Sequence, residues 1–114
     1  MENLSQVFQN YAFVTGYEVL KFERTQTVLR SKIVVAIQDG SSLFISEATT
    51  PRGFRYAYHW QDSAGNLLAR WDNAPHHQNL VTFPDHFHTA TTVEPSAQPT
   101  IREVLEYLAD RLRS

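Results

Sequence analysis

Two stretches of alternating residues, 54–60 and 67–72, constrain the fold of this chain more than any other feature. Each places an apolar residue at every second position: Phe54, Tyr56, Tyr58 and Trp60, then Leu67, Ala69 and Trp71. A period of two is typical of a strand with one buried face. The segment Asp62-Ser63-Ala64-Gly65 between them has turn composition. The two stretches are therefore predicted to form an antiparallel hairpin.

The same alternation predicts the register, because a slip of one residue would turn an apolar set to the wrong face. We expect three pairs on the core face: Trp60 with Leu67, Tyr58 with Ala69, and Tyr56 with Trp71. This register would make Arg55 and Asp72 cross-strand neighbours. The polar face would then carry four functional side chains: Arg55, His59, Arg70 and Asp72.

The rest of the chain predicts an α+β fold. Apolar spacing over Leu4–Tyr11 indicates a short N-terminal helix. Strand-like segments follow at 17–22, 27–30, 33–38 and 43–47, with an Asp39-Gly40 hairpin turn between the last two. Residues 73–99 read as a long loop. Thr100 and Glu103 form a capping box that opens an amphipathic helix over 100–111.

We therefore expect a single domain, residues 1–114, built on an antiparallel sheet of about four to five strands. The short N-terminal helix and the C-terminal amphipathic helix would lie on one face of this sheet. The other face would stay partly open, which suits a binding surface.

Composition narrows the class of protein. The chain contains no run of about 18 apolar residues, so no membrane span is predicted. Its first residues lack the pattern of a secretory signal, and we therefore expect a cytoplasmic protein. The chain has no cysteine, which excludes disulfides and thiolate chemistry. A net charge of −2 argues against a large nucleic-acid footprint, although a local RNA site stays open.

Histidines are the main candidates for chemistry. Four of the five fall between positions 76 and 88: His76, His77, His86 and His88. Imidazole titrates near neutral pH and can serve as general acid and base. With arginines to hold a phosphate, such residues could cleave RNA through attack by its own 2′-hydroxyl, without a metal or cofactor.

Each candidate has a predicted role. In an extended segment His86 and His88 point to the same side, and either could act as acid or base together with His76 or His77. Asp72 would orient a histidine or an arginine. Four residues would contact the substrate: Arg55, Arg70, His59 and Asn73.

Other interpretations of these residues stay open at this point. The loop histidines could cap turns or stack on aromatic rings, and His59 could be structural. Histidines together with Asp72 also suit zinc, but no regular ligand spacing is present, so we expect no metal. The aromatic face of the hairpin fits a core better than a base-stacking platform.

The chain resembles the TumE-type toxin family of bacterial toxin–antitoxin modules. The most specific match is Asp72-Asn73-Ala74-Pro75-His76-His77, and Thr82-Phe83-Pro84 with His86 and His88 match the family's second block. Asp85 stands where the family usually has a histidine, and Phe87 where it usually has a lysine. Loss of either residue would weaken or retarget the protein if that position were essential.

The resemblance implies a small cytosolic toxin that is neutralised by a cognate antitoxin protein. We expect its target to be RNA or the ribosome and its action to be ribonuclease-like, with no membrane partner and with a homodimer left open. Two alternatives remain: a non-enzymatic module that inhibits a protein target, and a metal-dependent enzyme that uses histidine and aspartate.

Overall fold

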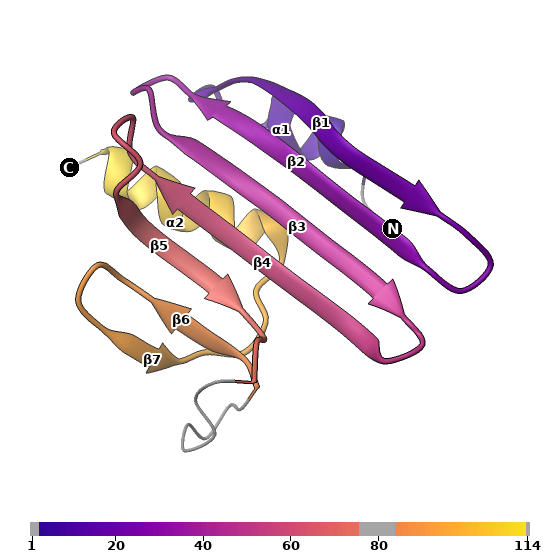
Figure 1. Cartoon of the computed structure of the whole chain (residues 1–114). Helices are drawn as coiled ribbons and strands as arrows, with labels where there is room; N and C mark the ends of the chain where they lie inside the picture. The colour runs from indigo at the N-terminus through magenta and orange to yellow at the C-terminus, as the bar shows by residue number, and fades with distance from the viewer. Residues whose placement is uncertain (1–2, 76–83, 114) are drawn as a thin grey trace.

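A computed structural model describes residues 3–75 and 84–113 of the chain. It contains two helices and seven strands, whose order is shown in Figure 1. Their bounds are α1 Leu4–Gln9, β1 Val14–Arg24, β2 Leu29–Ile37, β3 Ser42–Thr50, β4 Gly53–Gln61, β5 Leu67–Asp72, β6 His86–His88, β7 Val93–Pro95 and α2 Ile101–Leu112. No helix among the described residues is long and apolar enough to cross a membrane.

The strands form one antiparallel sheet in which each strand pairs with the next along the chain, from β1 to β7. The α+β class is confirmed, but the expectation of four to five strands is wrong, because the sheet has seven. The extra strands β6 and β7 have three residues each and lie in the segment expected to be a loop. Strands this short show no recognisable period.

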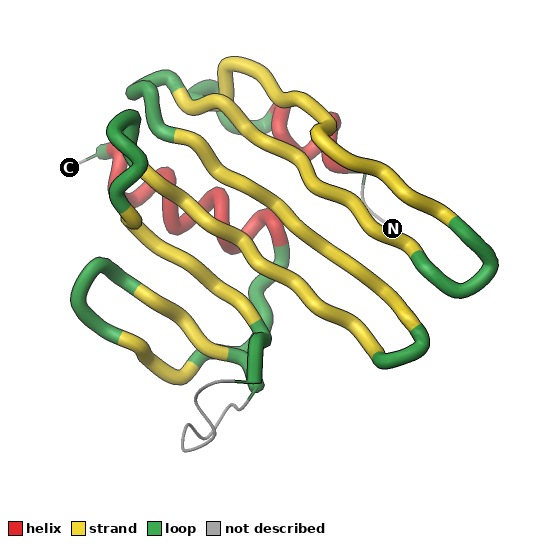
Figure 2. Tube along the Cα trace, in the orientation of Figure 1, coloured by secondary structure: helices red, strands yellow, loops and turns green. Residues whose placement is uncertain are grey.

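Both helices cover the same face of the sheet, as Figure 2 shows, where they lie behind the strands. The core lies between the helices and the sheet. It combines apolar side chains of α1 and α2 with those of β2–β5: Val7, Phe8, Val104, Leu105 and Leu108 with Val35, Leu43, Ile45, Tyr58, Trp60 and Trp71. Among the described residues, no helix lies on the opposite face of the sheet (Figure 2), as the sequence predicts.

The capping box at the start of α2 is confirmed. The Thr100 hydroxyl accepts a hydrogen bond from the Glu103 backbone N–H at 3.1 Å, and the Glu103 carboxylate accepts one from the Thr100 N–H at 2.8 Å. These bonds satisfy backbone donors that have no partner within the helix. α2 thereby begins at Ile101, with its apolar residues aligned on the core.

Thr100→Ala is therefore expected to lower the free energy of unfolding by roughly 0.5–2 kcal/mol through loss of this cap. The change should leave function intact, because α2 packs on the face opposite the open one. Denaturant titration measures the effect. An unchanged midpoint would contradict a stabilising role for the cap.

The hairpin of β4 and β5 keeps the predicted faces for Tyr56, Tyr58, Trp60, Ala69 and Trp71 but has a different register. Leu68, expected on the polar face, packs against the core. Trp60 pairs with Ala69 and Tyr58 with Trp71, so the predicted pairing is wrong by two residues. A shift of two preserves the faces, since side chains alternate with a period of two. Two shifts of one residue add up: Leu67 pairs with Gln61 in place of Trp60, and Leu68 is then left as an extra residue before Ala69 pairs with Trp60. Asp72 consequently lies opposite Ala57 and not Arg55.

Candidate functional site

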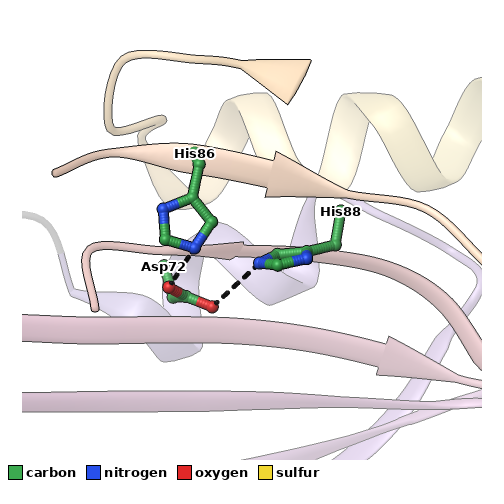
Figure 3. Close-up of side chains that lie close together, drawn as sticks. All are labelled: Asp72, His86 and His88. Carbon is green, nitrogen blue, oxygen red and sulfur yellow. Dashed lines mark ion pairs between the residues drawn. The ribbon is translucent and has the colours of Figure 1, made fainter. Parts of the chain in front are cut away.

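A cluster of polar side chains lies on the open face where β5 pairs with β6. Asp72 lies opposite His86, and Arg70 lies opposite His88. Figure 3 shows both imidazoles turned toward the Asp72 carboxylate. His86 Nε2 is 2.8 Å from Asp72 Oδ1, and His88 Nε2 is 3.6 Å from Oδ2. The predicted alignment of the two histidines on one side of an extended segment is confirmed.

The two histidines differ in accessibility. The His86 side chain is 2% exposed, whereas that of His88 is 21% exposed. The expectation that both lie in a long loop is wrong, because both belong to strand β6 of the sheet. His88 stands edge-on to His86, with ring centroids 4.6 Å apart. Of these two rings, His88 is the one that a substrate can reach.

His86 is held from two sides. Its Nδ1 is 2.8 Å from the Pro84 carbonyl oxygen, and its Nε2 is 2.8 Å from the Asp72 carboxylate. Carbonyl and carboxylate oxygens only accept hydrogen bonds, so this geometry fits a ring that carries hydrogen on both nitrogens. His86 thereby fixes the orientation of the Asp72 carboxylate.

Asp72 is buried and accepts several hydrogen bonds. Its donors are Arg70 Nε at 2.7 Å, the Ala74 N–H at 3.0 Å and the His86 ring. Burial opposes ionisation of this carboxyl, but the bonds from Arg70 and Ala74 and the nearby His86 outweigh it, and the pKa of Asp72 lies below its ordinary value. The carboxylate is therefore charged at neutral pH, as its predicted orienting role requires.

Arg70 is fixed at two points of its guanidinium group. Nε donates to Asp72, and Nη1 lies 3.1 Å from His59 Nδ1. Burial and then the charges of Arg70 and Lys32 lower the pKa of His59, so its Nδ1 accepts from Arg70 while its Nε2 faces the Gln61 side-chain oxygen at 3.1 Å. A planar guanidinium held in this way is preorganised to donate hydrogen bonds to an anion such as phosphate.

Arg55 and Asn73 lie at one end of this cluster. Arg55 is exposed and donates from Nη1 to the Asn73 carbonyl oxygen at 3.3 Å. The Asn73 side chain donates to the Phe54 carbonyl oxygen at 2.8 Å and accepts from the Tyr56 N–H at 3.0 Å. Asn73 therefore joins the end of β5 to β4, and Arg55 stays at the surface.

The structure thus brings five predicted residues into one neighbourhood: His59, Arg70, Asp72, His86 and His88. Arg55 and Asn73 adjoin it. His76 and His77 lie outside the described residues. Sequence reasoning did not assign Lys21, Arg30, Lys32 or Phe44 to the site, because only the pairing of β1–β4 places them on this face.

A transition metal is a rival occupant of the cluster. One donor atom from each of Asp72, His86 and His88 lies within 4.8 Å of the other two, and zinc accepts such a ligand set. However, Arg70 Nε contacts Asp72 Oδ2, and the hydrogen between Asp72 and His86 occupies Oδ1. A metal ion would have to displace the contacts of Arg70 and His86 with this carboxylate. These contacts favour the arrangement without a metal.

Asp85 and Phe87, where this chain departs from the expected pattern, point away from the cluster. The Tyr56 hydroxyl donates to Asp85 Oδ1 at 2.7 Å. The Phe87 ring lies 4.8 Å from that of Trp71 and 5.5 Å from that of Tyr107, on the helix-bearing side. The strand alternation therefore separates both departures from His86 and His88.

The model of the family described as toxin TumE matches residues 4–112, nearly the whole chain. The chain belongs to the TumE toxin family. No curated protein and no solved structure shows significant similarity to it. The structure places several residues of the family motifs on the open face. They are Asp72, Asn73 and Ala74 from the first block, and His86 and His88 from the second.

Proposed function

We propose that this TumE-family toxin cleaves RNA by attack of the 2′-hydroxyl on the adjacent phosphate, without a metal. The observation that carries the proposal is the placement of Arg70, fixed by Asp72 and His59, across the β5–β6 pairing from the accessible His88. A held cation stabilises charge that develops on the phosphate. An imidazole beside it transfers protons.

The roles follow from accessibility and contacts. Arg70 binds the scissile phosphate, Arg55 binds a neighbouring one, and His88 serves as general acid or base. Asp72 and the buried His86 position Arg70 and each other. Asn73 shapes the site by fixing the end of β5, and His59 holds Arg70 at the substrate.

The reaction needs a second proton-transfer group, for which we propose His76 or His77 on grounds of sequence. One group takes the proton of the 2′-hydroxyl, whose oxygen forms the new bond to phosphorus. The bond from phosphorus to the 5′-oxygen breaks, and the other group protonates that oxygen. The products are a 2′,3′-cyclic phosphate and a 5′-hydroxyl.

Membership in a toxin family implies an antitoxin partner. We propose that this partner is a protein encoded beside the toxin and that the toxin acts in the cytoplasm.

The test is incubation of purified toxin with labelled single-stranded RNA in the presence of a chelator. We expect products that end in a 2′,3′-cyclic phosphate, none from an oligonucleotide that lacks 2′-hydroxyls, and none with His88→Gln. Cleavage that depends on an added metal would contradict the mechanism, as would stoichiometric zinc in protein purified without added metal. Toxicity without any RNA cleavage would favour a protein-binding inhibitor.

A further inference from the structure

A hollow of about 310 Å³ on the open face lies beside the histidine cluster. Its lining includes small residues of β3 and β4, namely Ser46, Ala48 and Ala57, and five cationic residues, namely Lys21, Arg30, Lys32, Arg55 and Arg70. Two acidic residues also line it: Glu47, which accepts a hydrogen bond from the Tyr58 hydroxyl, and Asp72, which is paired with Arg70. The chain has 10 lysines and arginines and a net charge of −2. Half of the lysines and arginines thus line this hollow, so positive charge is concentrated on the open face although the net charge of the chain is negative.

The charges around the hollow are not balanced. Lys21 and Lys32 lie directly opposite each other on β1 and β2, a pairing of like charges that destabilises a sheet. Among the described residues, no carboxylate lies within ion-pair distance of Lys21, Lys32 or Arg55. An anion bound between Lys21 and Lys32 would offset the repulsion between these two like charges.

A partly buried aromatic ring adjoins the same cations. Phe44 on β3 lies opposite His59 on β4, with ring centroids 6.3 Å apart, and Lys32 Nζ lies 5.7 Å from the Phe44 ring. The cross-strand pairing continues from His59 to Arg70 and then to His88. Phe44 and His59 therefore lie in the same cross-strand row as Arg70 and His88, the two groups proposed to act on phosphate.

The distance across this face points to a polymer as the ligand. Lys32 on β2 and Asp72 on β5 belong to one cross-strand row through Ser46 and Ala57. Three inter-strand steps amount to about 14 Å, further than one phosphate group reaches. A strand of nucleic acid that binds cations through its phosphates and stacks its bases on aromatic rings fits such a surface.

We propose that the open face is a binding track for single-stranded RNA, with phosphates at Lys21, Lys32 and Arg55 and bases at Phe44 and His59. This inference rests on the proposed function, since it delivers the scissile phosphate to Arg70 and His88. Unpaired bases are required, because paired bases do not expose their faces for stacking.

The experiment measures binding separately from cleavage. A labelled single-stranded 2′-fluoro RNA of mixed sequence, which lacks the attacking hydroxyl, is titrated at several salt concentrations. Lys21→Gln with Lys32→Gln should weaken binding on the order of tenfold and reduce the salt slope by about 1.4, the value for two lost phosphate contacts on a single strand. Phe44→Ala should weaken binding by about fivefold or more.

The matched control is Arg111→Gln with Arg113→Gln, which removes the same charge from α2 on the other side of the sheet. It should bind as the wild type does. Wild-type affinity and salt slope in the lysine variant would overturn the track even if the toxin cleaves RNA. Binding that depends on Lys21 and Lys32 without cleavage of ordinary RNA would support the track and refute the acid–base mechanism. Loss of antitoxin binding alone in the lysine variant would identify a protein-docking face and overturn the proposal.

Discussion

Asp72→Asn is expected to lower the free energy of unfolding by about 3–5 kcal/mol, the cost of breaking a buried charged pair by removing one partner. The Asp72 and His86 side chains are 7% and 2% exposed, and their atoms are 2.8 Å apart. The amide would remove the negative charge that faces both His86 and Arg70. The variant should also lose activity, since Arg70 would no longer be held at Nε. Denaturant titration and RNA cleavage measure the two effects.

Asp110→Asn is the control, because it removes an equal charge from an exposed pair with Arg113; its unfolding midpoint should not change. The effect of Asp72 should also depend on pH. Its pKa is depressed in the folded state, so its stabilisation is present above the unfolded value of about 3.9 and is lost as pH falls through the folded value. The stabilities of wild type and Asp72→Asn should therefore converge in acid. A constant difference from pH 7 to pH 2 would contradict this account.

The sequence correctly predicts those parts of the fold that depend on a local pattern, such as the alternation of apolar residues in a strand with one buried face. The alternation in β4 and β5 correctly assigns Tyr56, Tyr58 and Trp60 to the core, and the capping box correctly places the start of α2. The H-x-H spacing correctly puts His86 and His88 on one side. In each case the local period or the local hydrogen bonds decide the structure.

Long-range pairing decides the rest, and the sequence carries little signal for it. The pairing of Gln61 with Leu67 and the extra residue Leu68 each shift the hairpin register by one. The total shift of two leaves Tyr58, Trp60 and Trp71 on the predicted face, so the apolar pattern does not distinguish the two registers. β6 has three residues, and only its pairing with β5 and β7 makes it a strand. Burial of His86 follows from that pairing, and the approach of Lys21 to Lys32 follows from the pairing of β1 with β2. Neither follows from neighbouring residues in the sequence.

His88→Gln is expected to abolish the toxicity of the chain when it is expressed without antitoxin, and growth should return to that of cells with an empty vector. Glutamine keeps a polar side chain of similar length but transfers no protons at neutral pH. The His88 side chain is 21% exposed, and its nearest Asp72 oxygen is 3.6 Å away, so its loss should leave the fold in place. Growth curves after induction, with circular dichroism of each purified variant, provide the measurement.

His86→Gln is the comparison that separates chemistry from folding. Because His86 is 2% exposed and contacts both Pro84 and Asp72, we expect this change to lower the unfolding midpoint as well as the toxicity. The double replacement of both histidines would mix the two effects, so the single variants are the informative ones. A folded His88→Gln protein that still arrests growth would remove His88 from the mechanism. If wild-type expression has no effect on growth in several hosts, this chain is an inactive member of its family.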